Sequence, residues 1–321
     1  MPPHPLIGHA RQITELAQDI ESGNIAHAYL FAGSPSLGKS TIAKWFAREI
    51  LTDKKTPEEK EVIDHELERL IHADFLSLDQ LWIEEQCEDF DIIAQSTNVP
   101  QQHRAKTPTM KTDTIGIDDV REIQMRLQES GDGKFRFCFI RGIERMNESA
   151  ANSFLKILEE PPPGRVFLLT TDTLATVIPT ILSRSRVLRF QRVADKDIIS
   201  LLKDTPEEDR SFILHLAQGA PGTAIKLLRD PDLLRIEHTL HDTALAFWED
   251  SSSIDRMMAL KPLFERGPES DRFLFHLALA LRETTNYKPE QERALSHLSE
   301  GLRTNANRQL MTEEFALQIE K

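Results

Sequence analysis

Cysteine is nearly absent from this chain, which has only Cys87 and Cys138 among its 321 residues. So few cysteines, placed so far apart, exclude a disulfide framework and a four-cysteine zinc site. The fold must therefore be held by an apolar core, and we expect neither zinc nor another bound metal. A reducing compartment such as a bacterial cytoplasm suits this composition.

Long apolar runs are also lacking. No stretch reaches the roughly 18 apolar residues that a membrane-spanning helix needs. The N-terminus MPPHPLIGHARQ has neither the basic start nor the apolar stretch of a signal peptide. We therefore expect a cytoplasmic protein without a membrane partner.

Positive charge is scarce as well. The chain has 39 Lys and Arg residues but 52 Asp and Glu residues, which gives a formal net charge of −13. A protein that grips DNA by itself usually has a basic face and a high isoelectric point. Direct DNA binding by this chain alone is disfavoured, although the acidic total leaves room for a local basic patch. The length is sufficient for two or three domains.

A glycine-rich phrase stands out against this ordinary background. The segment FAGSPSLGKST at 31–41 has the complete phosphate-loop spacing, with Gly33, Gly38, Lys39 and Ser40 at the defining positions. In such a loop, backbone N–H groups surround the phosphates. Lys39 would reach the β- and γ-phosphates, and the Ser40 hydroxyl would ligate Mg²⁺.

The segments around this phrase favour a nucleotide loop over the alternative, a chance match in a helix-capping turn. An apolar strand is predicted at 28–32, and an amphipathic helix begins at Thr41, which completes the predicted binding set. Further apolar strands at 135–140 and 166–170 flank a helix that Asn147 caps. Strands that alternate with helices predict a parallel sheet.

Several phrases together resemble the AAA+ clamp-loader family, in particular the delta-prime family of bacterial DNA polymerase III subunits. They are HAYLFAG (27–33), GKST (38–41), NESAANSFLKILEEPP (147–162), FLLTT (167–171) and TILSRS (180–185). The resemblance covers about residues 4–230. It implies an α/β fold, in which an AAA+ P-loop parallel-sheet domain is followed by a small helical lid and a C-terminal helical collar.

The expected domain boundaries follow from this resemblance and from the change to helical patterns after Phe190. We expect a nucleotide-binding domain at 1–190 with an acidic insertion at about 52–112. A lid would occupy 191–231. A helical collar for oligomerisation would occupy 232–321.

The resemblance also assigns two side chains outside the loop. Arg184 matches the family's finger, an arginine that points out of its own subunit toward the nucleotide of a neighbour. Such a group stabilises charge on the transferred phosphoryl group. The alternative for Arg184 is a structural role at a strand–helix corner. Thr170 or Thr171 falls where the family keeps a polar sensor near the γ-phosphate, and we choose Thr171.

The chain departs from the family pattern where hydrolysis is concerned. The strand at 135–140 ends in Arg141 and Gly142, where the magnesium aspartate and the catalytic glutamate would stand. Glu144 lies too far past the strand to be a good substitute for the missing acids. The family's active subunits carry a second sensor arginine near positions 222 and 223, where this chain has Gly222 and Thr223. Without these groups nothing holds the metal or orients the attacking water. We expect an ATP- or ADP-binding loop without ATPase activity.

These observations predict a delta-prime-like subunit of the DNA polymerase III clamp loader, part of the DNA-directed DNA polymerase holoenzyme. By resemblance, it would form a hetero-pentamer with tau/gamma-type and delta-type subunits. It would meet the sliding clamp and primer–template DNA through the complex during replication. The alternatives are an active tau/gamma-type clamp-loader ATPase and a stand-alone DNA repair AAA+ ATPase, and both would need complete hydrolytic residues.

Overall fold

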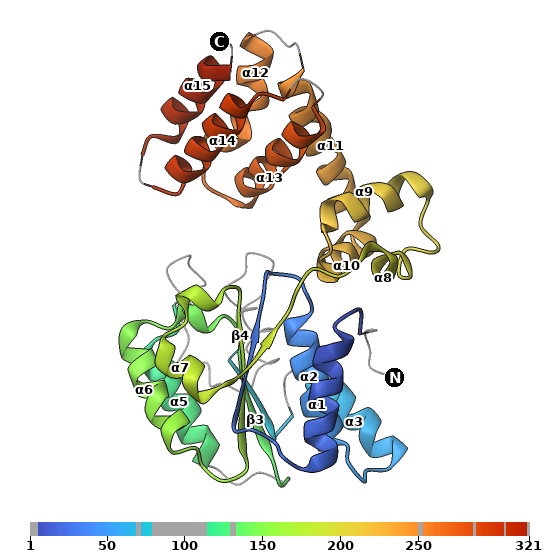
Figure 1. Ribbon diagram of the computed structural model, residues 1–321, viewed down its shortest axis with the longest axis vertical. Coiled ribbons are helices and arrows are strands. Elements are labelled where there is room, and N and C mark those ends of the chain that lie inside the picture. Colours follow the sequence, from blue (N-terminus) through green and yellow to red (C-terminus); the bar gives the residue numbers. More distant parts are fainter. Residues whose placement is uncertain are drawn as a thin grey trace. The chain divides into compact units, whose positions relative to one another are not determined.

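The computed structural model describes residues 6–68, 72–78, 114–128, 133–249, 253–284, 287–304 and 306–319. The chain forms two compact units, Met1–Ile225 and Lys226–Lys321. Figure 1 colours the chain by sequence, from blue at the N-terminus to red at the C-terminus. Among the described residues, no helix has both the length and the apolar character needed to cross a membrane.

The first unit is built on a parallel sheet, as the alternating pattern predicts. Its five strands lie in the order β2-β3-β4-β1-β5, and all neighbouring pairs are parallel. The predicted strand at 28–32 is confirmed residue for residue, and the other two are confirmed to within one residue at each end. The strands are β1 Ala28–Ala32, β2 Phe75–Leu78, β3 Arg136–Ile140, β4 Arg165–Thr171 and β5 Arg186–Arg189.

Helices cover both faces of this sheet (Figure 1). Successive side chains of a strand point to opposite faces, and β1 shows this clearly. Tyr29 and Phe31 pack in one core, whereas Leu30 packs in the other. The first core involves α1 Ala10–Ser22, α2 Lys39–Leu51 and α3 Pro57–Glu68, and the second involves α5 Ile117–Gln128, α6 Glu148–Glu159 and α7 Pro179–Arg184.

Part of the expected insertion belongs to the sheet. The sequence pattern placed all of 52–112 outside the core, but β2 within that range pairs with β3 from Phe75 to Leu78. Its four residues are buried. A short strand between a charged helix and a polar tract gives too little periodicity to be recognised. The helix α3 also lies in this range, and its Ile63 and Leu67 are buried in the first core. Residues 69–71 and 79–112 lie outside the described residues.

The elements after β5 are helical. The segment expected to form a lid contains α8 Asp195–Ile199, α9 Glu207–Ala217 and α10 Pro221–Arg229. The boundary between the two compact units falls inside α10. The second unit contains α11 Pro231–Trp248, α12 Ser253–Ala259, α13 Pro268–Glu283, α14 Pro289–Leu302 and α15 Arg308–Ile319.

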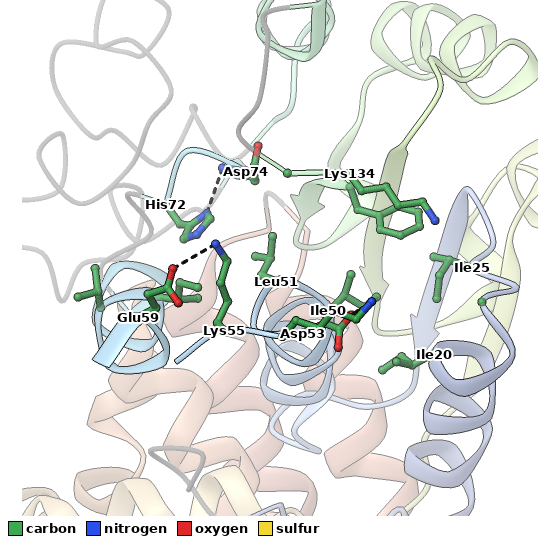
Figure 2. Close-up of a pocket in the computed structure, with 16 residues that line it drawn as sticks. Ile20, Ile25, Ile50, Leu51, Asp53, Lys55, Glu59, His72, Asp74 and Lys134 are labelled. Atoms are coloured by element: carbon green, nitrogen blue, oxygen red, sulfur yellow. Dashed lines mark hydrogen bonds and ion pairs between the residues drawn. The ribbon is translucent and has the colours of Figure 1, made fainter. Parts of the chain in front are cut away.

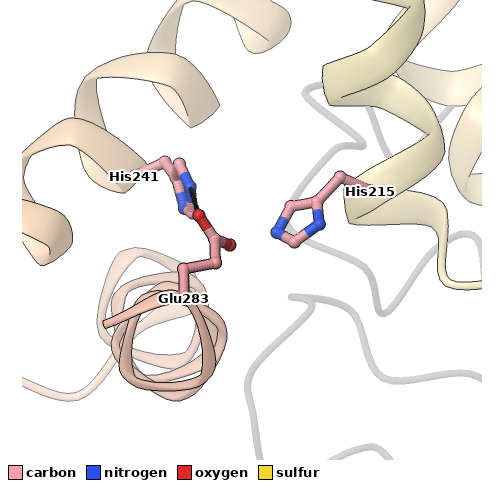
Figure 3. A group of neighbouring side chains, drawn as sticks. All are labelled: His215, His241 and Glu283. Carbon is pink, nitrogen blue, oxygen red and sulfur yellow. Dashed lines mark ion pairs between the residues drawn. The ribbon is translucent and has the colours of Figure 1, made fainter. Parts of the chain in front are cut away.

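A polar network joins α11 and α13 within the apolar core of the second unit. His276 is fully buried, and its Nε2 lies 2.6 Å from Glu237 Oε2. Its Nδ1 lies 3.4 Å from Nδ1 of His241. The other ring nitrogen of His241 lies 3.4 Å from Glu283 Oε2, an ion pair that Figure 3 shows. Because buried polar groups are costly without partners, this network fixes how the two helices pack.

Candidate functional site

The phosphate loop leaves β1 at Gly33 and ends at Gly38, the residue before α2. Gly33 has φ 154°, and a Cβ there would lie 2.5 Å from the carbonyl oxygen of Phe190. Gly38 has φ 88°. Positive φ values of this kind favour glycine, so the two glycines of the motif are required by backbone geometry. The first N–H groups of α2 have no partner within the helix, and they are suited to bind phosphate.

The loop lysine is buried and makes three contacts with its own chain. Lys39 is 7% exposed. Its ammonium donates to the carbonyl oxygen of Gly33, to that of Ser34 at 3.0 Å, and to Asp172 Oδ1 at 2.7 Å. A lysine ammonium has three N–H donors. All three are therefore used within the chain in this conformation.

Three consecutive residues at and just after the end of β4 make different contacts. Thr171, the predicted sensor, is fully buried and donates its hydroxyl to the carbonyl oxygen of Thr173 at 2.9 Å. The next residue, Asp172, instead reaches Lys39. The preceding residue, Thr170, accepts a hydrogen bond from the backbone N–H of Gly142 at 3.0 Å. Sequence analysis did not select Asp172, because its importance comes from a contact between residues far apart in the chain.

Glu144 lies beside this turn. Its Oε1 accepts a hydrogen bond from the backbone N–H of Asp172 at 3.2 Å. β3 ends at Ile140, and Arg141 and Gly142 follow it directly. The acids Glu144 and Asp172 therefore come from the turns after β3 and β4, whereas the two residues directly after β3 are a cation and a glycine.

A small apolar cavity of about 180 Å³ lies next to the loop. It is lined by the segment before α1, the start of α2 and the start of α10, with Leu6, Ile7, Leu37, Pro221 and Ile225 supplying most of the apolar wall. Gly38 and Thr41 line it as well. A cavity of this size and polarity, directly beside the phosphate loop, is suited to a flat apolar ring such as a nucleobase.

Two contacts bring other segments against the loop. The imidazole of His9 lies with Nε2 2.9 Å from the carbonyl oxygen of Leu37, and its ring packs on Phe190. Burial lowers the pKa of His9, an effect that the carbonyl of Leu37 partly opposes. On the other side, Gly222 donates its backbone N–H to the carbonyl oxygen of Ser36 at 2.8 Å. A Cβ at Gly222 would lie 2.8 Å from that oxygen, so a glycine permits this close approach.

Arg184 ends α7, and it contacts α6 and its own helix. Its Nη2 donates to Glu159 Oε1 at 2.9 Å, and its Nη1 donates to the carbonyl oxygen of Thr180 at 3.1 Å and to the Ser183 hydroxyl at 3.2 Å. About a third of the Arg184 side chain is exposed. None of these partners belongs to the phosphate loop of the same chain.

A second cavity, of about 720 Å³, lies at the carboxyl end of α2, at the edge of the sheet opposite the phosphate loop. Figure 2 shows Lys55 directed toward Glu59, with the two side chains 3.5 Å apart. The lining of this second cavity includes both lysines and carboxylates, among them Lys134 and Asp74. Mixed charge favours no single ligand class, and none of the predicted site residues lines this cavity.

The residues around the loop fit a nucleotide in part. Loop glycines, the start of α2 and the apolar cavity provide a cradle for phosphates and base. Lys39, however, is already paired with a carboxylate. The predicted loop residues Gly33, Gly38, Lys39, Ser40 and Thr41 are brought together by the fold, whereas the Thr171 hydroxyl turns to its own backbone.

The sheet order, the phosphate loop after β1 and the helices that follow β5 define an AAA+ P-loop fold. The fold is shared with a DNA polymerase III gamma subunit-related protein from Thermotoga maritima, with a TM-score of 0.53 and 19% identity. That alignment covers 96% of this chain and 99% of the other. At this identity the likeness concerns the fold alone.

Relatives of known name point to one family. A family model described as DNA polymerase III, delta subunit, matches residues 8–194. The chain therefore belongs to this family, and it is a member of the bacterial DNA polymerase III clamp-loader proteins. It is 34% identical over 120 residues to DNA polymerase III subunit delta' of Haemophilus influenzae, covering 36% of this chain and 37% of that protein.

Gamma-type proteins match over longer stretches. The chain is 25% identical over 234 residues to DNA polymerase III subunit gamma of Buchnera aphidicola from Acyrthosiphon pisum, covering 70% of this chain and 56% of the other. The chain thus spans between about a third and somewhat more than half of the length of these relatives. These matches establish the family, and they do not distinguish the delta-prime type from the gamma type.

Proposed function

We propose that this chain is a delta-prime-like, catalytically silent subunit of the bacterial DNA polymerase III clamp loader. The observation that carries the proposal is the carboxyl end of β3, where Arg141 and Gly142 stand in place of acids. Phosphoryl transfer needs a metal ligand and a group that orients the attacking water. A motor subunit of the gamma or tau type would require both, so the site favours the silent subunit.

We further propose that the subunit offers Arg184 to a neighbouring ATPase. Its partly exposed guanidinium and the absence of a loop residue among its partners support this role. An arginine in trans stabilises the charge on the transferred phosphoryl group. The phosphate loop would then hold ATP or ADP as a static clamp that stabilises the fold.

Assembly would follow from the collar. The described part of the second unit is entirely helical, with an apolar core around Phe247, Trp248, Phe273 and Phe315. We propose that it joins tau/gamma-type and delta-type subunits in a pentamer in the cytoplasm, and that the sliding clamp and primed DNA are met through this complex. The chain boundaries proposed for the three domains remain 1–190, 191–231 and 232–321.

Reconstitution tests this function. The full chain, mixed with a delta-type and a tau/gamma-type subunit of the same bacterium, should elute as one complex on size-exclusion chromatography. Loading of the sliding clamp on primed DNA should require all three proteins. Elution of this chain apart from the others, or full loading activity without it, would contradict the proposal.

A further inference from the structure

The contact between Lys39 and Asp172 affects which nucleotide the loop can take. Two of the three acceptors around the ammonium are backbone carbonyls of the loop itself, at Gly33 and Ser34. They belong to the backbone of the loop. The third acceptor, Asp172 Oδ1 at 2.7 Å, is the only one of the three on a side chain. A phosphate oxygen that uses this donor must displace or share it.

The Asp172 carboxylate is presented by a fixed turn. Thr171 donates its hydroxyl to the Thr173 carbonyl, and Glu144 accepts the backbone N–H of Asp172. The side chain of Asp172 is 53% exposed, so it approaches Lys39 from the open side of the site. Glu144 places a second carboxylate beside the Asp172 backbone. A new negative group there would meet like charges.

The apolar cavity of about 180 Å³ beside the phosphate loop indicates how a nucleotide would lie, because it is suited to the base. The residues that line the cavity come from the segments 6–9, 37–42 and 221–225, and neither β4 nor the turn after it contributes to its lining. A base in this cavity directs its phosphate chain across the loop toward Lys39. In a triphosphate the γ-phosphate lies farthest from the base, and it is therefore the phosphate that meets Asp172.

We propose that Asp172 makes this site selective for nucleoside diphosphates over nucleoside triphosphates. The inference rests on the proposed nucleotide-clamp role of the loop. With a diphosphate, the β-phosphate occupies the loop N–H groups, and the Asp172 carboxylate stays on Lys39 where a γ-phosphate would otherwise lie. With a triphosphate, the γ-phosphate must displace Asp172 and come to rest beside it and Glu144. The Asp172 carboxylate thus takes the place of the γ-phosphate as the anionic partner of Lys39.

Titration calorimetry of the purified full chain with ADP and with ATP tests this selectivity. The unaltered chain should bind ADP about tenfold or more tightly than ATP, a difference of about 1.4 kcal/mol. Asp172→Asn keeps the shape of the side chain and removes its charge. This variant should bind ATP about tenfold more tightly than the unaltered chain, with ADP affinity changed less than about threefold.

A matched variant controls for the change in net charge. Asp204→Asn makes the same change at an exposed position outside the site, and it should leave both affinities unchanged. If Asp172→Asn unfolds, salt provides a second test on the unaltered chain. Because ions screen partly exposed charges, the preference for ADP should decrease as the salt concentration rises.

Several results would overturn the inference. They are equal affinity for ATP and ADP in the unaltered chain, an ADP preference that Asp172→Asn leaves in place, and no binding of either nucleotide to either protein. If the Asp172→Asn variant binds ATP and the unaltered chain does not, the result supports the inference. Failure of the inference is distinct from failure of the subunit role, because assembly and the contribution of Arg184 are measured in the reconstituted loader without reference to these affinities.

Discussion

Lys39 Nζ lies 2.7 Å from Asp172 Oδ1, across 133 residues of sequence. The pair joins the start of α2 to the turn after β4, two segments that the parallel sheet brings to the same edge because β1 and β4 are neighbours. A charge-assisted contact of this length is a strong one. The phosphate loop is therefore held in a formed state by its own chain, and nucleotide binding competes with this contact.

The isolated chain should not hydrolyse ATP. Arg141 and Gly142 leave the end of β3 without a metal ligand or a group to orient water. Phosphate release by the purified chain should therefore equal that of the Lys39→Ala variant, which serves as the matched control. Turnover that clearly depends on the lysine would identify the chain as an active, gamma-type motor.

Acidification should weaken the contact between the N-terminal segment and the phosphate loop. Burial lowers the pKa of His9 in the folded chain, while the unfolded chain keeps the ordinary value of about 6.5. Between these two values the unfolded state binds more protons, so stability is complete above about pH 6.5 and decreases as pH falls toward the folded pKa. The contribution of His9 to the free energy of unfolding is thus lost as the pH falls below this value.

A variant separates this effect from that of the other histidines. His9→Asn removes the titrating ring, and asparagine accepts the left-handed backbone found there, with φ 55°. The loss in melting temperature between about pH 7.5 and about pH 5.5 should be smaller for this variant than for the unaltered chain. Equal losses would show that His9 does not couple loop stability to pH.

The apolar runs and the capping residues predicted the sheet domain well. β1 was predicted to the residue because five consecutive apolar residues are bounded by polar ones and by Gly33. The cap at Asn147 was also correct, since its side chain accepts the N–H of Ala150 at 2.8 Å. Both features depend on neighbours in sequence, and local patterns are sufficient for them.

The features that the sequence analysis missed depend on distant contacts. β2 has only four residues, and its assignment requires the hydrogen bonds to β3 that start at Phe75 and Phe137. Asp172 follows the predicted sensor directly, yet nothing in the local sequence distinguishes it from other aspartates in turns. The cavity beside the loop combines Leu6 with Ile225, which only the folded chain brings together.

The polar network of the second unit should contribute to its stability. Glu237→Ala leaves the Nε2 group of the fully buried His276 without its partner at 2.6 Å. The free energy of unfolding should decrease by about 1–3 kcal/mol, the usual cost of an unsatisfied buried polar group. Urea unfolding of the full chain measures this change.

Two further variants make the comparison specific. Glu237→Gln can still accept the hydrogen bond, so it should cost less than the alanine variant. Glu300→Ala removes an exposed carboxylate elsewhere in the same unit, and it should change stability by less than about 0.5 kcal/mol. Similar losses in all three variants would show that the network adds nothing beyond ordinary helix packing.

Replacement of Arg184 tests the trans role directly. Arg184→Ala should leave the chain folded, because the side chain is partly exposed and its ion pair with Glu159 is a surface contact worth little to stability. The variant should also assemble into the loader. At the one ATPase site that it completes, loss of such an arginine costs about 10³–10⁵ in rate. The loss for the whole complex should be smaller, because the other sites keep their own arginines.

Two comparisons decide between this role and a structural one. Arg184→Lys should not restore full activity, since lysine cannot reproduce the planar guanidinium fork. Glu159→Ala removes the partner of Arg184 at 2.9 Å, and any effect of this change should disappear when Arg184 is already alanine, because the two act as one unit. The measurement is DNA- and clamp-stimulated ATP hydrolysis by the reconstituted loader. Unchanged hydrolysis with Arg184→Ala, in a complex that assembles normally, would leave Arg184 as a structural residue that holds α7 against α6.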